Sequence, residues 1–102
     1  MIERLLIPAW NAPSRSIDDW KKQFEQLGYP PSIHAEDHEE TWLLIDSIET
    51  RLLAVVEGSI LTALHAELRA HDPSIALGLL DQAATGLNWE VHDTEDDEDD
   101  ER

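Results

Sequence analysis

The first clear element in the pattern of apolar and polar residues is an amphipathic helix. Four apolar residues recur at intervals of three and four, which places them on one helical face: Ile17, Trp20, Phe24 and Leu27. Ser16 precedes this stripe as a favourable N-cap, and Asp18 and Asp19 suit the positive end of the helix dipole. Gly28 follows the stripe, where glycine commonly ends a helix. We therefore expect a helix over residues 17–27 with its apolar face packed inward.

Short apolar segments at the two ends of the chain predict strands. The run from Ile2 to Ile7 is stopped by Pro8, as at the end of a strand. The segment over residues 87–91 alternates apolar and polar side chains, which is typical of a half-buried strand. We therefore expect the first and last elements of the domain to be strands.

The middle of the chain allows two interpretations. Two apolar runs, over residues 42–45 and 52–56, flank a polar stretch, which predicts a β-hairpin. The same region also fits helical spacing, and the acids just before it suit a helix start. We favour the hairpin. The alternative is a helical segment over residues 36–57, which would make the chain all-α.

The stretch after the hairpin predicts two helices in succession. Ser59 is a plausible cap for a first helix that runs to about His71, and its apolar residues share one face: Ile60, Leu61, Leu64 and Leu68. Asp72 and Pro73 then suit the cap and the first position of a second helix, which Gly86 ends. The second helix is expected to bury one stripe: Ile75, Ala76, Leu79, Leu80 and Ala83.

The order of these elements predicts a small α+β domain. It resembles a ferredoxin-like βαββαβ arrangement with a split second helix, in which the segment from Tyr29 to Glu40 is a linker. This arrangement hosts many unrelated activities, so the resemblance says almost nothing about function. An open sheet with exposed edges and a one-sided surface favours a homodimer.

Negative charge dominates the composition, with a formal net charge of −16 over 102 residues. Eight of the nine residues over 93–101 are Asp or Glu, so we predict a compact domain over residues 1–92 and a disordered acidic C-terminal tail over 93–102. Removing residues 93–102 takes away eight acids and one arginine and leaves 15 acids and 6 bases, a charge of −9. The body is therefore acidic without its tail.

The same composition excludes several classes of partner and site. Only seven Lys and Arg residues are present, and they are scattered, so we expect no direct binding to nucleic acid or to an anionic membrane. Cysteine is absent, which excludes disulfides and thiolate metal sites. No stretch approaches the ~20 apolar residues of a membrane span, and the first apolar run is too short for a signal peptide. We expect a cytoplasmic protein.

One polar cluster contains the residue types that bind metals: His34, Glu36, Asp37, His38, Glu39 and Glu40. On a helix, His34 and His38 would lie one turn apart, a spacing that allows two imidazoles to bind one metal ion. Ala35 follows His34, however, so the H-E-x-x-H motif is absent. The tail lacks the glycine of an EF-hand loop. We favour a solvated linker and predict no metal and no cofactor.

Catalytic motifs are missing as well. No serine lies in a G-x-S-x-G context, and no two of the four glycines are closer than eight residues, which excludes a glycine-rich phosphate loop. We therefore predict that the protein is not an enzyme.

Tryptophan is unusually frequent, with four residues in the chain. Trp20, Trp42 and Trp89 fall in predicted helices or strands, so core packing is expected for them. Trp10 lies in the loop after the first strand, where a large amphipathic ring is a favoured interface anchor.

These observations predict a small, non-enzymatic regulatory, inhibitor or adaptor protein that binds the basic surface of a protein partner. A nucleic-acid mimic that inhibits a DNA- or RNA-binding protein is the first alternative, and a metal-binding protein that uses the cluster over residues 34–40 is the second. The predicted partner-binding residues are Trp10, Glu36, Asp37, Glu39, Glu40, Asp96, Asp97, Asp99 and Asp100.

Overall fold

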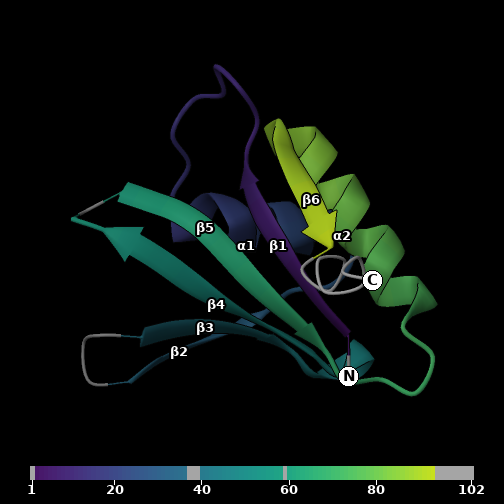
Figure 1. Cartoon of the computed structure of the whole chain (residues 1–102). Coiled ribbons are helices and arrows are strands. Elements are labelled where there is room, and N and C mark those ends of the chain that lie inside the picture. The colour runs from purple at the N-terminus through teal and green to yellow at the C-terminus, as the bar shows by residue number, and fades with distance from the viewer. Residues whose placement is uncertain (1, 37–39, 59, 94–102) are drawn as a thin grey trace, which may run out of the picture.

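The computed structural model describes residues 2–36, 40–58 and 60–93, which form one six-stranded antiparallel sheet and two α-helices. The strand order across the sheet is β2-β3-β4-β5-β1-β6 (Figure 1). The elements in chain order are β1 (Ile2–Pro8), α1 (Ile17–Gln26), β2 (Ser32–Glu36), β3 (Glu40–Ile45), the 3-10 helix η1 (Asp46–Ile48), β4 (Thr50–Glu57), β5 (Ile60–Leu68), α2 (Ser74–Leu87) and β6 (Trp89–Asp93). The predicted α+β class is confirmed. The ferredoxin-like βαββαβ order is wrong, because that arrangement has four strands.

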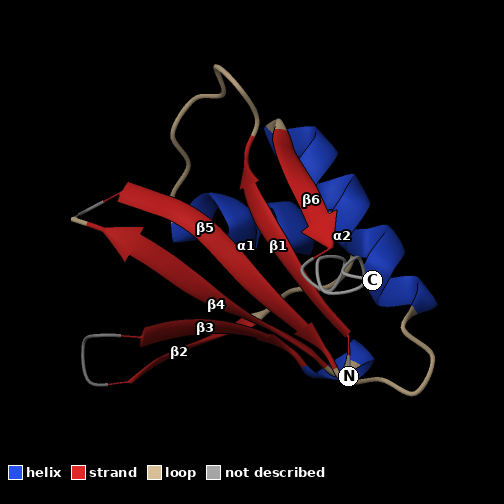
Figure 2. Cartoon of the chain, in the orientation of Figure 1, coloured by secondary structure: helices blue, strands red, loops and turns tan. Residues whose placement is uncertain are grey.

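The two helices lie on the same side of the sheet (Figure 2). Their buried side chains join one core with the strand residues that point toward them, among them Leu6, Leu43, Leu52, Leu64 and Ala66. Cross-strand partners in an antiparallel sheet point to the same side. The pairing therefore defines a covered face, which meets the helices, and an open face, which meets no helix in the described chain.

Helix α1 forms where its sequence pattern predicted it. The Ser16 hydroxyl accepts a hydrogen bond from the Asp19 N–H at 3.1 Å, and the Asp19 carboxylate accepts one from the Ser16 N–H at 3.0 Å. This reciprocal capping box satisfies two amide groups that the first turn leaves without a helical partner. Trp20 and Phe24 are fully buried, and the Trp20 ring meets the edge of Trp89 at a centroid distance of 5.2 Å.

The predicted hairpin in the middle of the chain is confirmed as β3 and β4, and the helical alternative for residues 36–57 is wrong. The strands pair in register from Thr41 opposite Ala54 to Ile45 opposite Thr50. The turn between them is η1 followed by Glu49 in the left-handed region, at φ 50°. A polar turn of this kind ends the apolar run and reverses the chain.

Strand β5 replaces the first of the two predicted helices. Its buried residues Leu61 and Leu64 are three apart, a spacing that suggested a helical face. The cause is a β-bulge, at which Val55 pairs with Ala63 and Val56 with Leu61, so that Thr62 is an extra residue in β5. The bulge lets both leucines point to the covered face, and the strict alternation of Leu64, Ala66 and Leu68 follows it.

Strand β2 forms in the middle of the segment that was predicted to be a linker. It pairs with β3 from Ser32 opposite Leu44 to Glu36 opposite Glu40, at one edge of the sheet. Its described side chains are exposed, so the strand shows no buried alternating pattern. Pairing with the β3 backbone holds it in place instead.

Helix α2 matches the second predicted helix in position, and four of the five residues predicted for its buried stripe are buried: Ala76, Leu79, Leu80 and Ala83. Ile75 is 60% exposed, contrary to expectation, because the buried stripe starts one residue later: Ala76, Leu79, Leu80, Ala83, Ala84 and Leu87. Gly86 lies inside the helix rather than at its end, and the Gln23 side chain of α1 occupies the space that a Cβ there would fill. Asn88, at φ 65°, is the left-handed cap that ends the helix.

Strand β6 confirms the predicted final strand and extends it to Asp93. The Asp93 carboxylate forms an ion pair with the Arg4 guanidinium at 3.2 Å. The predicted tail therefore begins within a strand, and its other residues, 94–102, lie outside the described part of the chain.

Candidate functional site

Three connections leave the sheet at the same end. β1 ends at Pro8, which pairs with Trp89, while Glu36 pairs with Glu40 and Glu57 with Ile60 at the ends of two hairpins. Because neighbouring strands are antiparallel, these ends lie on one side of the molecule. We call this region the loop end and define it by five described residues: Trp10, Glu40, Val56, Glu57 and Ile60.

Four exposed apolar side chains lie at the loop end, one in the turn after β1 and three in the β4–β5 hairpin. Trp10 is 89% exposed, Ile60 is 52% exposed and Val56 is 45% exposed, and Val55 beside them is 38% exposed. These are four of the six large apolar side chains that are exposed in the described part of the chain. The β4–β5 hairpin projects to the left in Figure 1, away from α2. Exposed apolar side chains at one end of a sheet make this end a candidate interaction site.

The backbone fixes the position of Trp10. The Ala12 N–H donates to the Ala9 carbonyl at 3.0 Å and closes a tight turn around Trp10 and Asn11. Asn11 has φ 70°, a left-handed value that asparagine tolerates better than most residues. The Ala9 N–H donates to the Asn88 carbonyl at 3.1 Å, which ties the turn to the start of β6. The Trp10 ring is therefore presented on a hydrogen-bonded support.

Carboxylates without a basic partner accompany these apolar groups. Glu40 and Glu57 are exposed and form no ion pair with another described residue. The acids of α1 differ, since Asp18 lies 3.2 Å from the Lys22 ammonium and Glu25 pairs with Lys21. An acid that its own chain does not neutralise is available to an external cation.

The structure places the predicted partner-binding residues in two groups. Trp10 is in the turn after β1, and Glu36 and Glu40 lie opposite one another at the ends of β2 and β3. β3 and β1 are separated by β4 and β5, a distance of about 14 Å at the usual strand spacing. The other predicted residues lie outside the described chain: Asp37, Glu39, Asp96, Asp97, Asp99 and Asp100.

Sequence analysis missed Val56 and Ile60. Val56 was assigned to a buried strand and Ile60 to the inner face of a helix, because both belong to apolar runs. The Gly58 turn carries a usable signal, since a glycine between two β-branched runs is typical of a hairpin. With that turn assigned, both residues fall at the tip of a hairpin.

The structure does not provide the helical geometry on which the metal-binding hypothesis depended. His34 lies in strand β2, opposite Trp42, so the one-turn spacing to residue 38 does not apply. Among the described residues, no group of three or more His, Asp or Glu side chains is arranged to hold a metal ion.

A cavity of about 310 Å³ opens at the opposite end of the sheet from the loop end. It is lined by Leu44, Asp46, Glu49, Thr50, Arg51 and Arg69. The Arg51 guanidinium is already paired with the Glu67 carboxylate at 2.6 Å. The two side chains with a shifted pKa lie outside this cavity. Hydrogen bonds from Ser74 lower the pKa of Asp72, and the hydrogen bond to Glu25 raises the pKa of Lys21.

No protein family matches the sequence, and no curated protein or solved structure is significantly similar to the chain. Neither described helix combines the length and the apolar character that crossing a membrane requires.

Proposed function

We propose that the chain is a small, non-enzymatic regulatory or adaptor protein that uses its loop end to bind the basic surface of a protein partner. The observation that carries this proposal is that exposed apolar side chains lie at the same end of the sheet as carboxylates that form no ion pair with another described residue. Trp10, Val56 and Ile60 supply the anchors, and Glu40 and Glu57 supply the charge. Interfaces commonly combine an apolar centre with a polar rim, and tryptophan is enriched among the residues that dominate binding energy.

The charge of the chain specifies the complementary surface. A formal net charge of −16 attracts a basic partner over long range and speeds the encounter, an effect that salt screens. The expected partner is a protein with an apolar pocket bordered by Lys and Arg. The proposal places this interaction in the cytoplasm.

The test begins with the full chain as bait at about 0.1 M salt, where electrostatic attraction is still strong. The recovered protein is identified, purified and titrated with variants. We expect Trp10→Ala combined with Ile60→Ser to weaken binding at least tenfold, since the anchors contribute most of the contact energy. Ile75→Ser is the control for Ile60→Ser, because Ile75 is 60% exposed, close to the 52% of Ile60, but lies on α2. It should bind as the wild type does.

Further variants test the charge. Glu40→Gln with Glu57→Gln should weaken binding and reduce its salt dependence, whereas Asp81→Asn on α2 should not. Equal binding by all these variants would overturn the proposed site. Deleting residues 94–102 measures the contribution of the acidic segment separately. A partner that nucleic acid displaces from the chain would instead support the mimic alternative.

A further inference from the structure

The open face of the sheet has an apolar centre. Antiparallel sheets that are covered on one side usually carry polar residues on the other. Here six large apolar side chains of β1, β3 and β4 point to the open face: Leu5, Ile7, Trp42, Leu44, Leu53 and Val55. All of them are partly or largely accessible to solvent. Ala63 of β5, opposite Val55, lies between the two groups of strands and makes the apolar surface continuous.

Carboxylates surround this apolar centre. Five described acids point to the open face, two near the loop end, two at the opposite end and one on the edge strand β6: Glu40, Glu57, Glu3, Glu67 and Glu90. Arg51 is the one Lys or Arg of the described strands on this face. The remaining bases there are histidines, which carry a charge only when protonated. The face therefore combines an apolar centre with an acidic rim.

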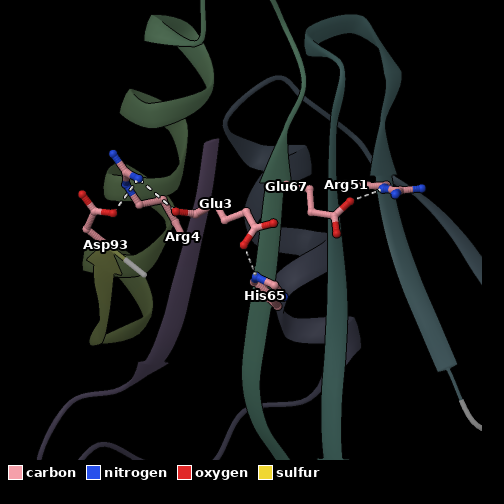
Figure 3. Close-up of polar contacts among 6 residues, drawn as sticks. All are labelled: Glu3, Arg4, Arg51, His65, Glu67 and Asp93. Atoms are coloured by element: carbon pink, nitrogen blue, oxygen red, sulfur yellow. Dashed lines mark hydrogen bonds and ion pairs between the residues drawn. The ribbon is translucent and has the colours of Figure 1, made fainter. Parts of the chain in front are cut away.

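The two acids farthest from the loop end are direct neighbours. Glu3 in β1 lies opposite Glu67 in β5, and like charges in this position repel. The Glu67 carboxylate lies 2.6 Å from Arg51, whereas the Glu3 carboxylate lies 3.4 Å from the His65 ring (Figure 3). Figure 3 shows these four side chains side by side across β1, β5 and β4, with α1 behind the strands. One arginine therefore serves two adjacent carboxylates, and a further cation would relieve their repulsion.

The acids on the other sides of the rim also lack a lysine or arginine among the described residues. Glu90 contacts the His92 ring at 2.9 Å, and Glu40 and Glu57 form no ion pair with another described residue. Helix α1 differs, because its Asp18 already lies 3.2 Å from a lysine of the same helix. The rim of the open face is thus a surface at which external cations would be favourable on every side.

The combination of centre and rim specifies the class of occupant. Nucleic acid and anionic membranes carry the same sign of charge as the rim, and a free metal ion would leave the apolar centre in water. A second copy of the chain would bring another five carboxylates against the first set. A protein surface with an apolar centre bordered by Lys and Arg matches both parts.

The dimensions of the apolar centre suit a single helix. The centre extends from β3 to β1, three strand spacings or ~14 Å, and over three rows of side chains along the strands, also ~14 Å. An α-helix with its side chains is about 10–12 Å wide. The covered face of the same sheet already packs against two helices, α1 and α2. One further helix would fill the apolar centre and bring its polar flanks to the rim.

We propose that the open face binds an amphipathic helix of a partner protein, with an apolar stripe that packs on Trp42 and Leu53 and with Lys and Arg along its flanks. The bound helix would form a third layer on the sheet. This inference rests on the proposed function, because Glu40 and Glu57 belong to both surfaces and the partner is basic in both. It extends the contact from the loop end across the sheet.

The probe is a synthetic helical peptide of about 18 residues, with Leu on one face and Lys on the other. The labelled peptide is titrated with the full chain at about 0.1 M and about 0.5 M salt, and binding is measured by fluorescence anisotropy. We expect the chain to bind it, more weakly at the higher salt. A peptide with Glu in place of every Lys is the charge control and should not bind.

Variants locate the binding surface. Leu53→Ser should weaken binding of the Lys peptide about tenfold, since it removes an apolar contact at the centre. Glu3→Gln with Glu90→Gln should weaken it about threefold and reduce its salt dependence. The matched controls make the same changes in the helix layer: Ile75→Ser, and Asp18→Asn with Asp81→Asn. Each control should bind as the wild type does.

Circular dichroism establishes that the variants are folded, and Val55→Ser replaces Leu53→Ser if the latter does not fold, because Val55 is already 38% exposed. A Lys peptide that does not bind, or that binds no better than the Glu peptide, would overturn the proposal. Equal losses in the control variants would overturn it as well.

Two further outcomes would assign the probe or the face differently. Binding that Trp10→Ala abolishes and Leu53→Ser leaves unchanged would place the peptide at the loop end, which overturns the present proposal and leaves the proposed function standing. Sedimentation equilibrium of the chain alone tests for a second copy. A dimer that Leu53→Ser dissociates, in a chain that does not bind the peptide, would give the open face to that copy and overturn the proposal.

Discussion

Leu52 and Leu53 are neighbours in β4, yet they belong to opposite faces of the sheet. Leu52 is fully buried on the covered face, against the core that α1 and α2 complete. Leu53 is partly exposed on the open face, where it lies between Trp42 and His65 in the cross-strand row. The two helices cover one face, whereas no described helix covers the other. Burying the core therefore leaves part of the apolar surface of the sheet in contact with solvent.

The two faces also differ in their content of polar and charged side chains. The described core contains one buried polar residue, Thr50, whose hydroxyl donates to the Ile48 carbonyl at 3.0 Å. The open face mixes leucine and tryptophan with the Arg51–Glu67 pair and with the exposed carboxylates of Glu40 and Glu57, which form no ion pair with another described residue.

The largest expected effect is the difference in unfolding free energy between Leu52→Ala and Leu53→Ala. Leu52→Ala should destabilise the fold by about 2–5 kcal/mol, since it leaves a cavity in a closed core. Leu53→Ala should cost less than about 1 kcal/mol at low protein concentration, where the open face meets water. Urea denaturation of both variants measures the difference. Equal costs at low concentration would contradict the distinction between the faces.

A smaller effect is expected from the ion pairs of the open face. Arg51→Met removes the contact with Glu67, whose side chain is 16% exposed, and the contact with the Trp42 ring. Partly exposed pairs and cation–π contacts are each weak, so we expect a loss of about 1 kcal/mol in unfolding free energy. Arg69→Met is the control, since Arg69 forms no ion pair with a described residue, and its effect should stay within about 0.5 kcal/mol. The same urea titrations measure both.

The smallest effect concerns the helix layer that covers the core. The Asp72 carboxylate accepts hydrogen bonds from the Ser74 hydroxyl at 2.7 Å and from the Ser74 N–H at 3.1 Å, which lower its pKa in the folded state. A lowered pKa contributes stability above the unfolded pKa of about 3.9, and this contribution is lost as pH falls through the folded value. Ser74→Ala removes the hydroxyl, so the pKa of Asp72 should rise toward its ordinary range.

An NMR titration of the Asp72 carboxyl group measures that shift directly. The small stability difference between Ser74→Ala and the wild type should be present at neutral pH. It should vanish in strong acid, where Asp72 is protonated in both proteins. A difference that persists unchanged in acid would show that Ser74 acts through something other than Asp72.

Local signals explain which elements could be predicted from the sequence. Helix α1 carries its own start, Ser16 with Asp19, and a complete apolar stripe, so its position follows from nearby residues. Strand β5 depends on a bulge whose extra residue, Thr62, is defined only by pairing with β4. Its hydroxyl donates to the Val55 carbonyl at 3.1 Å, a contact between strands that the pattern of β5 alone does not contain. Edge strand β2 was missed because it buries too little to leave a pattern.

The residues of the candidate site also differ in whether nearby sequence identifies them. Trp10 was identified because proline and loop residues surround it in the sequence. Ile60 was missed because its exposure follows from its pairing with Glu57, which turns both side chains to the face of the sheet that the helices do not cover. The open face could not be predicted either, since an apolar residue in a strand is assigned to a core until the positions of both helices are known.

The four tryptophans make each part of this molecule separately visible to fluorescence. Trp20 and Trp89 are buried in contact with one another, Trp42 lies under Arg51 on the open face, and Trp10 is almost fully hydrated. Three Trp→Phe replacements leave a single emitter at Trp42 or at Trp10. A blue shift from Trp42 then reports a less hydrated environment on the open face, and one from Trp10 reports that a partner has bound at the loop end. The chain contains its own spectroscopic probes for both surfaces.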